Sequence, residues 1–82
     1  MTLADNIRDY VILNIIEPAR KDGKRMVTVN ATDIHEALKL VSRYPAVCSA
    51  LDANKFLEIA KITLINREGP KQSTTAKWTF GL

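Results

Sequence analysis

The sequence has few cysteines and histidines, the residues that form disulfides and most metal sites. Its 82 residues include one cysteine, Cys48, and one histidine, His35. A single cysteine excludes an intrachain disulfide and a zinc site made of several cysteines. The longest apolar segment, Tyr10–Ile16, is interrupted by Asn14 and is far shorter than the ~20 residues that cross a bilayer. No basic and then apolar leader with a cleavage site opens the chain, so we expect a cytoplasmic protein without a membrane anchor.

Residue patterns for catalysis or cofactor binding are also missing. His35 lies between Asp33 and Glu36, but this spacing matches no metal-site pattern, so we expect a structural or solvent-facing histidine. Cys48 follows the start of a predicted helix, where a thiolate is favoured. No base is close to it in the sequence, and we expect a half-buried packing residue. The three glycines lack the spacing of a phosphate-binding loop. The sequence therefore predicts a protein that is not an enzyme and holds no metal or cofactor.

The residues that are present suffice for one small folded domain. The chain is 46% hydrophobic and 26% charged, values typical of globular proteins, and it is too short for two ordinary domains. We therefore treat residues 1–82 as a single domain. The net charge of +3 mildly favours a polyanionic partner. Cations cluster in Arg20–Arg25 and again at Arg67, Lys71 and Lys77, although each cluster is also typical of a solvated loop.

The first third of the chain predicts a helix from Leu3 to Glu17. Thr2 is a suitable N-cap, and the residue before Pro18 is restricted, so the helix should end or kink there. Its apolar residues surround the helix, with Ile7, Val11 and Ile15 on one face and Ile12, Leu13 and Ile16 spread round the other. Such a helix must be covered on nearly all sides. Either a partner chain covers its outer face, or Tyr10–Leu13 is a strand. We favour a helix that makes a homodimer contact.

The middle of the chain predicts a turn, a strand and a second helix. Gly23 supplies the positive φ of the turn. In Arg25–Ala31 apolar and polar residues alternate, which predicts a strand with one solvent-exposed face. Thr32 or Asp33 should cap the second helix, because Asp33 and Glu36 have the spacing of a capping box. The apolar positions of this helix are Ile34, Ala37, Leu38 and Val41.

A third helix should begin at Pro45 after a turn of about three residues, since proline suits the first helical position. Val47, Ala50 and Leu51 should point inward, with Cys48, Ser49 and Asp52 flanking them or facing out. The segment Lys55–Ala60 continues this helix or forms a short one of its own, packing Phe56 and Ile59.

The last third of the chain predicts a hairpin. Lys61–Arg67 is rich in β-branched residues, Gly69-Pro70 ends the first strand, and Lys71–Thr75 forms a polar tip. In the second strand Ala76, Trp78 and Phe80 alternate with Lys77, Thr79 and Gly81. This alternation favours core packing of Trp78 over stacking on a nucleic-acid base.

Three main helices with a short strand and a C-terminal two-stranded wing make an α+β fold with the element order of a winged helix-turn-helix. The segments Thr32–Leu38 and Arg43–Leu51 also resemble a stretch of small uncharacterised prokaryotic proteins. That resemblance supports treating the two helices as one unit and assigns no function.

A winged helix-turn-helix implies that the third helix lies in a major groove and the wing, Gly69–Thr75, runs along the backbone or minor groove. The phosphate contacts we expect come from Ser42, Arg43, Lys55, Arg67, Lys71 and Lys77, with hydroxyls from Ser73 and Thr74. Base readers would have to be Ser49, Asp52 and Asn54. These are small residues and an acid, and phosphates repel Asp52 unless it reads a cytosine or pairs with Lys55.

Two functions follow from these patterns. The first is a non-enzymatic module that binds duplex DNA through backbone-led contacts, for example as a homodimeric transcriptional regulator that pairs through Leu3–Glu17. The second is a protein-interaction or assembly module on the same scaffold, because the predicted third helix offers so little to bases. The fold alone does not choose between them.

Overall fold

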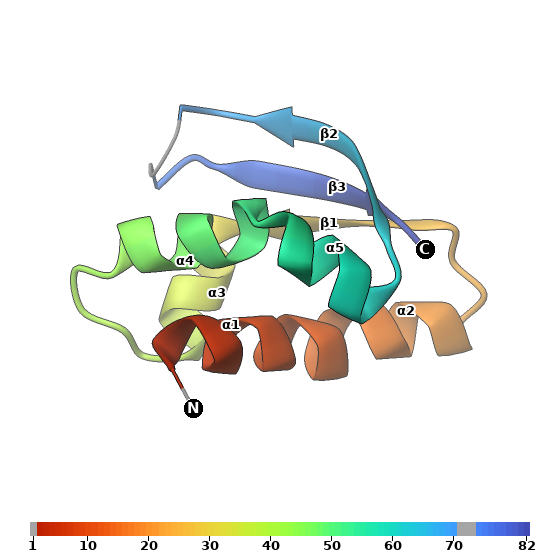
Figure 1. Cartoon of the computed structure of the whole chain (residues 1–82), viewed down its shortest axis with the longest axis horizontal. Helices are drawn as coiled ribbons and strands as arrows, with labels where there is room; N and C mark the ends of the chain where they lie inside the picture. Colours follow the sequence, from red (N-terminus) through yellow and green to blue (C-terminus); the bar gives the residue numbers. More distant parts are fainter. Residues whose placement is uncertain (1, 71–73) are drawn as a thin grey trace.

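A computed structural model describes residues 2–70 and 74–82, which form an α+β fold with helices packed on one side of a three-stranded antiparallel sheet (Figure 1). In chain order the described elements are α1 (Leu3–Val11), the π-helical segment η1 (Ile12–Ile16), α2 (Glu17–Lys21), β1 (Met26–Asn30), α3 (Ala31–Ala37), α4 (Tyr44–Asp52), α5 (Asn54–Ala60), β2 (Thr63–Glu68) and β3 (Lys77–Gly81). Within the described residues, every helix is too short or too polar to span a membrane.

α1, η1 and α2 follow one another without a break and form one long helix across the molecule (Figure 1). The predicted N-cap is confirmed: the Thr2 hydroxyl accepts a hydrogen bond from the Asp5 amide at 3.1 Å, and the Asp5 carboxylate accepts one from the Thr2 amide at 3.4 Å. Of the predicted end or kink at Glu17-Pro18, the end is wrong, because the helix continues to Lys21, although a π-helical segment precedes Pro18. The alternative strand at Tyr10–Leu13 is also excluded, since these residues are helical.

The sheet has the strand order β1-β3-β2, so the last strand lies in the centre. The predicted C-terminal hairpin is confirmed, and Trp78 and Phe80 point into the core with no exposed surface, as expected. Val29 pairs with Trp78 across β1 and β3. β1 ends at Asn30, and Ala31, expected in the strand, is the first residue of α3.

α3 differs from its prediction at both ends. Its N-cap is Asn30, whose side-chain amide donates to the Asp33 carboxylate at 3.1 Å, so the capping box expected from Asp33 is not formed. The helix ends at Ala37, and residues 38–43 separate it from α4, a longer link than the expected turn. Val41 therefore lies outside the helix and is 80% exposed rather than packed.

One core lies between the helices and the inner face of the sheet. Phe56 and Phe80 meet edge to face, with ring centroids 5.4 Å apart. Val47, Ala50 and Leu51 are buried as predicted, and Cys48 is fully buried rather than half-buried. α5 is a separate short helix that buries Phe56, but Ile59, expected to pack with it, is 54% exposed.

Candidate nucleic-acid interface

The C-terminal hairpin is anchored to the start of α3 by two hydrogen bonds. The Ala31 amide donates to the Ala76 carbonyl at 3.0 Å, and the Thr32 hydroxyl donates to the Thr74 carbonyl at 2.8 Å. These bonds hold the segment that leads into β3 against the first turn of α3. The Thr32 hydroxyl, expected at a helix cap, is used for this purpose.

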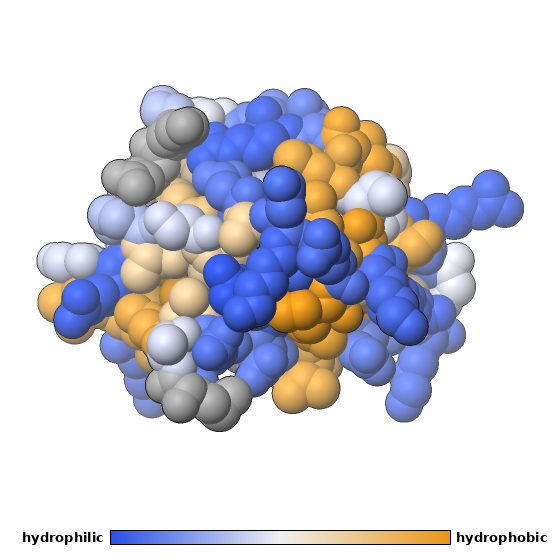
Figure 2. All heavy atoms as spheres, viewed as in Figure 1, coloured by the Kyte–Doolittle hydropathy of each residue, from blue (hydrophilic) through white to orange (hydrophobic). Residues whose placement is uncertain are grey.

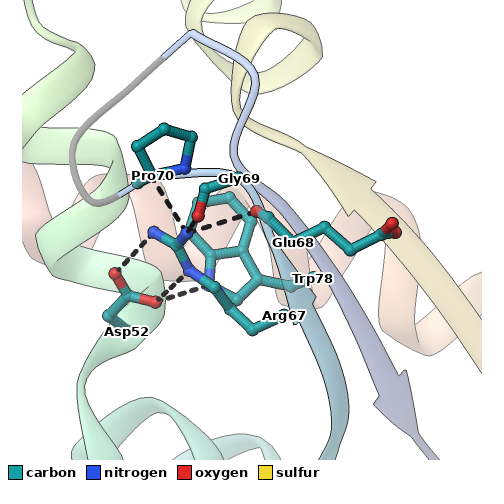
Figure 3. A network of polar contacts seen from close by, with 6 residues as sticks. All are labelled: Asp52, Arg67, Glu68, Gly69, Pro70 and Trp78. Atoms are coloured by element: carbon teal, nitrogen blue, oxygen red, sulfur yellow. Dashed lines mark hydrogen bonds and ion pairs between the residues drawn. The ribbon is translucent and has the colours of Figure 1, made fainter.

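A second anchor joins the hairpin to the end of α4 (Figure 3). The Nε atom of Arg67 lies 3.2 Å from Oδ1 of Asp52, and Nη2 lies 3.2 Å from Oδ2, which makes a bidentate ion pair. Asp52 also accepts a hydrogen bond from the indole Nε1 of Trp78 at 2.7 Å. The Arg67 guanidinium carbon lies 5.3 Å from the centre of the Trp78 ring, within cation–π distance.

The third nitrogen of Arg67 binds the backbone of the hairpin as it leaves β2. The two N–H groups of Nη1 are shared among three carbonyls, those of Glu68 at 3.2 Å, Pro70 at 3.1 Å and Gly69. All three nitrogens of the guanidinium therefore have acceptors within the chain. Arg67, expected to contact phosphate, is already engaged in the protein's own structure, and the partner of Asp52 is Arg67 rather than Lys55.

The start of α4 is held by His35, which is only 8% exposed. The Arg43 amide donates to Nε2 of His35 at 3.1 Å, and the imidazole stacks on the Tyr44 ring at 4.1 Å between centroids. Because Nε2 accepts, the ring proton lies on Nδ1 when the imidazole is neutral. Ser42 adopts the left-handed conformation, with φ 52°. This arrangement fixes the backbone before α4, while Ser42 and Arg43 themselves are exposed.

α4 itself presents a narrow outer face. Pro45, Ser49 and Asp52 are exposed, and the helix contains neither lysine nor arginine. Asn54 and Lys55 follow at the exposed start of α5. Hydrogen bonds with Thr2 lower the pKa of Asp5, and Lys55 is near enough to contribute a smaller lowering.

The remaining predicted contacts belong to the hairpin. Thr74 and Lys77 are exposed beside the first turn of α3, whereas Lys71 and Ser73 lie outside the described residues. The loop before α4 lies at the same end of the molecule as the end of β2 and the start of β3, opposite the turn between α2 and β1 (Figure 1). The structure thus brings the Arg43 loop and the described parts of the hairpin to one end.

The cationic segment Arg20–Arg25 lies at the opposite end, where α2 turns into β1 (Figure 1). Arg20 has a structural role there: its Nη2 donates to the carbonyls of Ala60 at 2.8 Å and Lys61 at 2.7 Å, just past the end of α5. Lys61 has a left-handed φ of 56°, which ends that helix. The Arg20–Arg25 cluster therefore does not add to the surface near the hairpin.

Among residues 2–70 and 74–82 no ligand-sized pocket opens, and no group of histidine, cysteine or acidic side chains is placed to hold a metal ion. Comparison of the chain with protein families, with curated proteins and with solved structures finds no significant match. The function must therefore be argued from this chain alone.

Proposed function

We propose that the chain is a winged helix-turn-helix domain that binds duplex DNA mainly through its phosphate backbone. The observation that carries the proposal is the double anchoring of the hairpin, to α3 through Thr32 and to α4 through Asp52. These bonds hold the described parts of the hairpin to both helices, which supports a shared DNA-binding surface. In the proposed complex α4 approaches the major groove, and the hairpin follows the backbone.

The proposed phosphate contacts lie at the hairpin end of the molecule. Arg43 and Lys77 supply exposed cations, and Ser42 and Thr74 are exposed beside them. Lys71 and Ser73 belong to the same part of the sequence and complete the proposed wing contact. Base contacts fall to Ser49 and Asn54, with Lys55 beside them. Small side chains discriminate poorly between base pairs, so we expect affinity with little sequence preference.

Fluorescence anisotropy of a labelled random-sequence duplex, measured over a series of salt concentrations, tests this function. The logarithm of affinity should fall against the logarithm of salt concentration by about 0.9 for each phosphate neutralised. We expect Arg43→Ala and Lys77→Ala each to reduce that slope by about one such step. Lys24→Ala removes the same charge at the opposite end and should leave the slope unchanged. If adding the protein leaves the anisotropy of the duplex unchanged at low salt, the proposal is refuted.

The homodimer through the first helix is a separate proposal. Leu13 in η1 is 67% exposed, and Ile12 and Ile15 beside it are only partly buried. A second copy of the chain would cover these side chains. Sedimentation velocity should show a dimer that Leu13→Lys converts to a monomer, with Glu36→Lys, exposed on α3 and outside the first helix, as the control. A wild-type chain that stays monomeric at all concentrations contradicts the dimer.

A protein-interaction module is the second candidate. The hydrophobic side chains Ile59, Leu64 and Ile65 are all more than 40% exposed, on α5 and β2. Figure 2 shows hydrophobic surface over these elements, bordered by hydrophilic side chains. Together with the absence of cations from α4, this surface favours a protein partner if the duplex does not bind.

A further inference from the structure

We propose that Asp52 and Arg67 are positioning residues: their ion pair fixes the exit of β2, Glu68–Pro70, against the end of α4, and this placement sets the affinity for DNA. The part that concerns affinity rests on the proposed function. The part that concerns placement stands on the geometry of the network alone (Figure 3).

Asp52 is held in place by Trp78 as well as by Arg67. Trp78 is fully buried, and its indole Nε1 donates to Asp52 at 2.7 Å. A buried ring on the central strand β3 is a rigid donor, so one oxygen of the carboxylate has a fixed position. Arg67 then binds both oxygens at 3.2 Å and lies over the same ring.

The pair is partly shielded from solvent. The Arg67 side chain is 17% exposed and that of Asp52 is 34% exposed. Two parallel N–H···O bonds from a planar guanidinium also impose a direction that a single contact does not. Arg67 is therefore fixed in orientation as well as in position.

The oriented guanidinium in turn gathers three successive carbonyls, those of Glu68, Gly69 and Pro70, on Nη1. These residues form the exit from β2 toward the tip of the hairpin. Asp52 on α4 thus controls the backbone of the hairpin through Arg67. Loss of the carboxylate charge leaves the guanidinium without its anchor, and the carbonyls lose a fixed donor.

Simple electrostatics and positioning predict opposite effects of Asp52→Asn. If only charge matters, removal of an anion beside the DNA surface strengthens binding. If Asp52 positions the hairpin, binding weakens, by about three- to tenfold, which corresponds to about 0.7–1.4 kcal/mol. The slope against salt stays as in the wild type, because Asp52 itself neutralises no phosphate.

Two further variants complete the design. Arg67→Lys keeps the charge but loses the two-bonded geometry, so positioning predicts weaker binding whereas charge alone predicts no change. Glu58→Gln removes an exposed acid from α5 and is the control for loss of one negative charge. It should bind DNA as well as the wild type or more tightly. Circular dichroism checks that each variant is folded.

A readout without DNA separates the two parts of the proposal. Backbone ¹⁵N order parameters of Glu68, Gly69, Thr74 and Thr75 should fall in Asp52→Asn and stay unchanged in Glu58→Gln. Unchanged order parameters in Asp52→Asn overturn the placement, whether or not the duplex binds. Lower order parameters with unchanged or tighter DNA binding overturn the link to affinity. If the wild type itself does not bind the duplex, the proposed function fails, and the placement is decided by the order parameters.

Discussion

Gly69 and Gly23 form a matched pair that separates backbone strain from steric overlap. Both have left-handed backbones, with φ 85° at Gly69 and φ 76° at Gly23. A Cβ at Gly23 meets nothing within 4 Å. A Cβ at Gly69 would lie 2.8 Å from the carbonyl oxygen of Thr75 and 3.2 Å from the Cα of Ala76. These are backbone atoms, which cannot move aside by rotating a side chain.

The expected cost follows from these contacts. Gly23→Ala should lower the free energy of unfolding by about 1–2 kcal/mol, the cost of an L-residue in the left-handed region. Gly69→Ala carries the same strain together with overlap against the returning chain, which adds about 1–3 kcal/mol. In a domain of this size each kcal/mol lowers the melting temperature by about 4–8 °C. The two variants should therefore melt at clearly different temperatures.

Urea unfolding followed by fluorescence of Trp78, the one tryptophan of the sequence, measures both variants. The wild type and both variants should share one m-value, so that midpoints report stability. Equal destabilisation by the two substitutions would refute the reasoning, because it would mean that the close approach of Gly69 to Thr75 costs nothing.

Three further predictions concern helix ends. Thr2→Ala removes the N-cap and should destabilise the fold by about 0.5–2 kcal/mol in thermal unfolding. Hydrogen bonds from Thr2 lower the pKa of Asp5, so Asp5 stabilises the fold above its ordinary pKa of 3.8, and this contribution is lost as the pH falls through the lower folded value. Acid titration followed by circular dichroism should therefore show that Asp5→Asn loses less stability than the wild type as the pH falls below 3.8. His35→Phe keeps an aromatic ring against Tyr44 but leaves the Arg43 amide without its acceptor, which should cost about 1–3 kcal/mol in urea unfolding.

Local patterns predicted the parts of the fold that depend on near neighbours in the chain. Alternation identified β3 and the inward direction of Trp78 and Phe80, and the hydroxyl of Thr2 identified the start of α1. Both signals come from residues within a few positions of one another. The pairing of β1 with β3 depends on residues about 50 positions apart, as in the contact of Thr28 with Thr79, and no local pattern carried it.

Pro18 was expected to end or kink the first helix, and the structure shows how the helix continues past it. Proline removes one amide donor and clashes with the carbonyl four residues earlier. In η1 the chain takes up an extra residue per turn, and the Glu17 amide donates to Ile12, five residues back. Pro18 then falls in the first turn of α2, where proline is tolerated. The rule for proline holds, but the π turn could not be predicted from it.

The site at Arg67 could not be predicted because of one inserted residue. Regular pairing that starts from Thr63 opposite Gly81 would place Asn66 opposite Trp78 and direct Arg67 outward with Lys77. A β-bulge at Ile65 shifts the register, so Arg67 faces Trp78 on the core side. The sequence pattern counted Arg67 as a surface cation, and the bulge turns it into an intrachain ligand of Asp52.

Arginines that bond within the chain are not available to phosphates, which limits how strongly the chain can bind a polyanion. Arg20 and Arg67 donate to acceptors within the chain, and the other exposed cations of Arg20–Arg25 lie at the far end. Among the described residues, Arg43 and Lys77 are the cations of the proposed phosphate contact. If each neutralises one phosphate, together they account for a salt slope of about −1.8. If Lys71 of the proposed wing neutralises a third phosphate, the slope becomes about −2.7, and a much steeper slope would require cations outside the proposed contact.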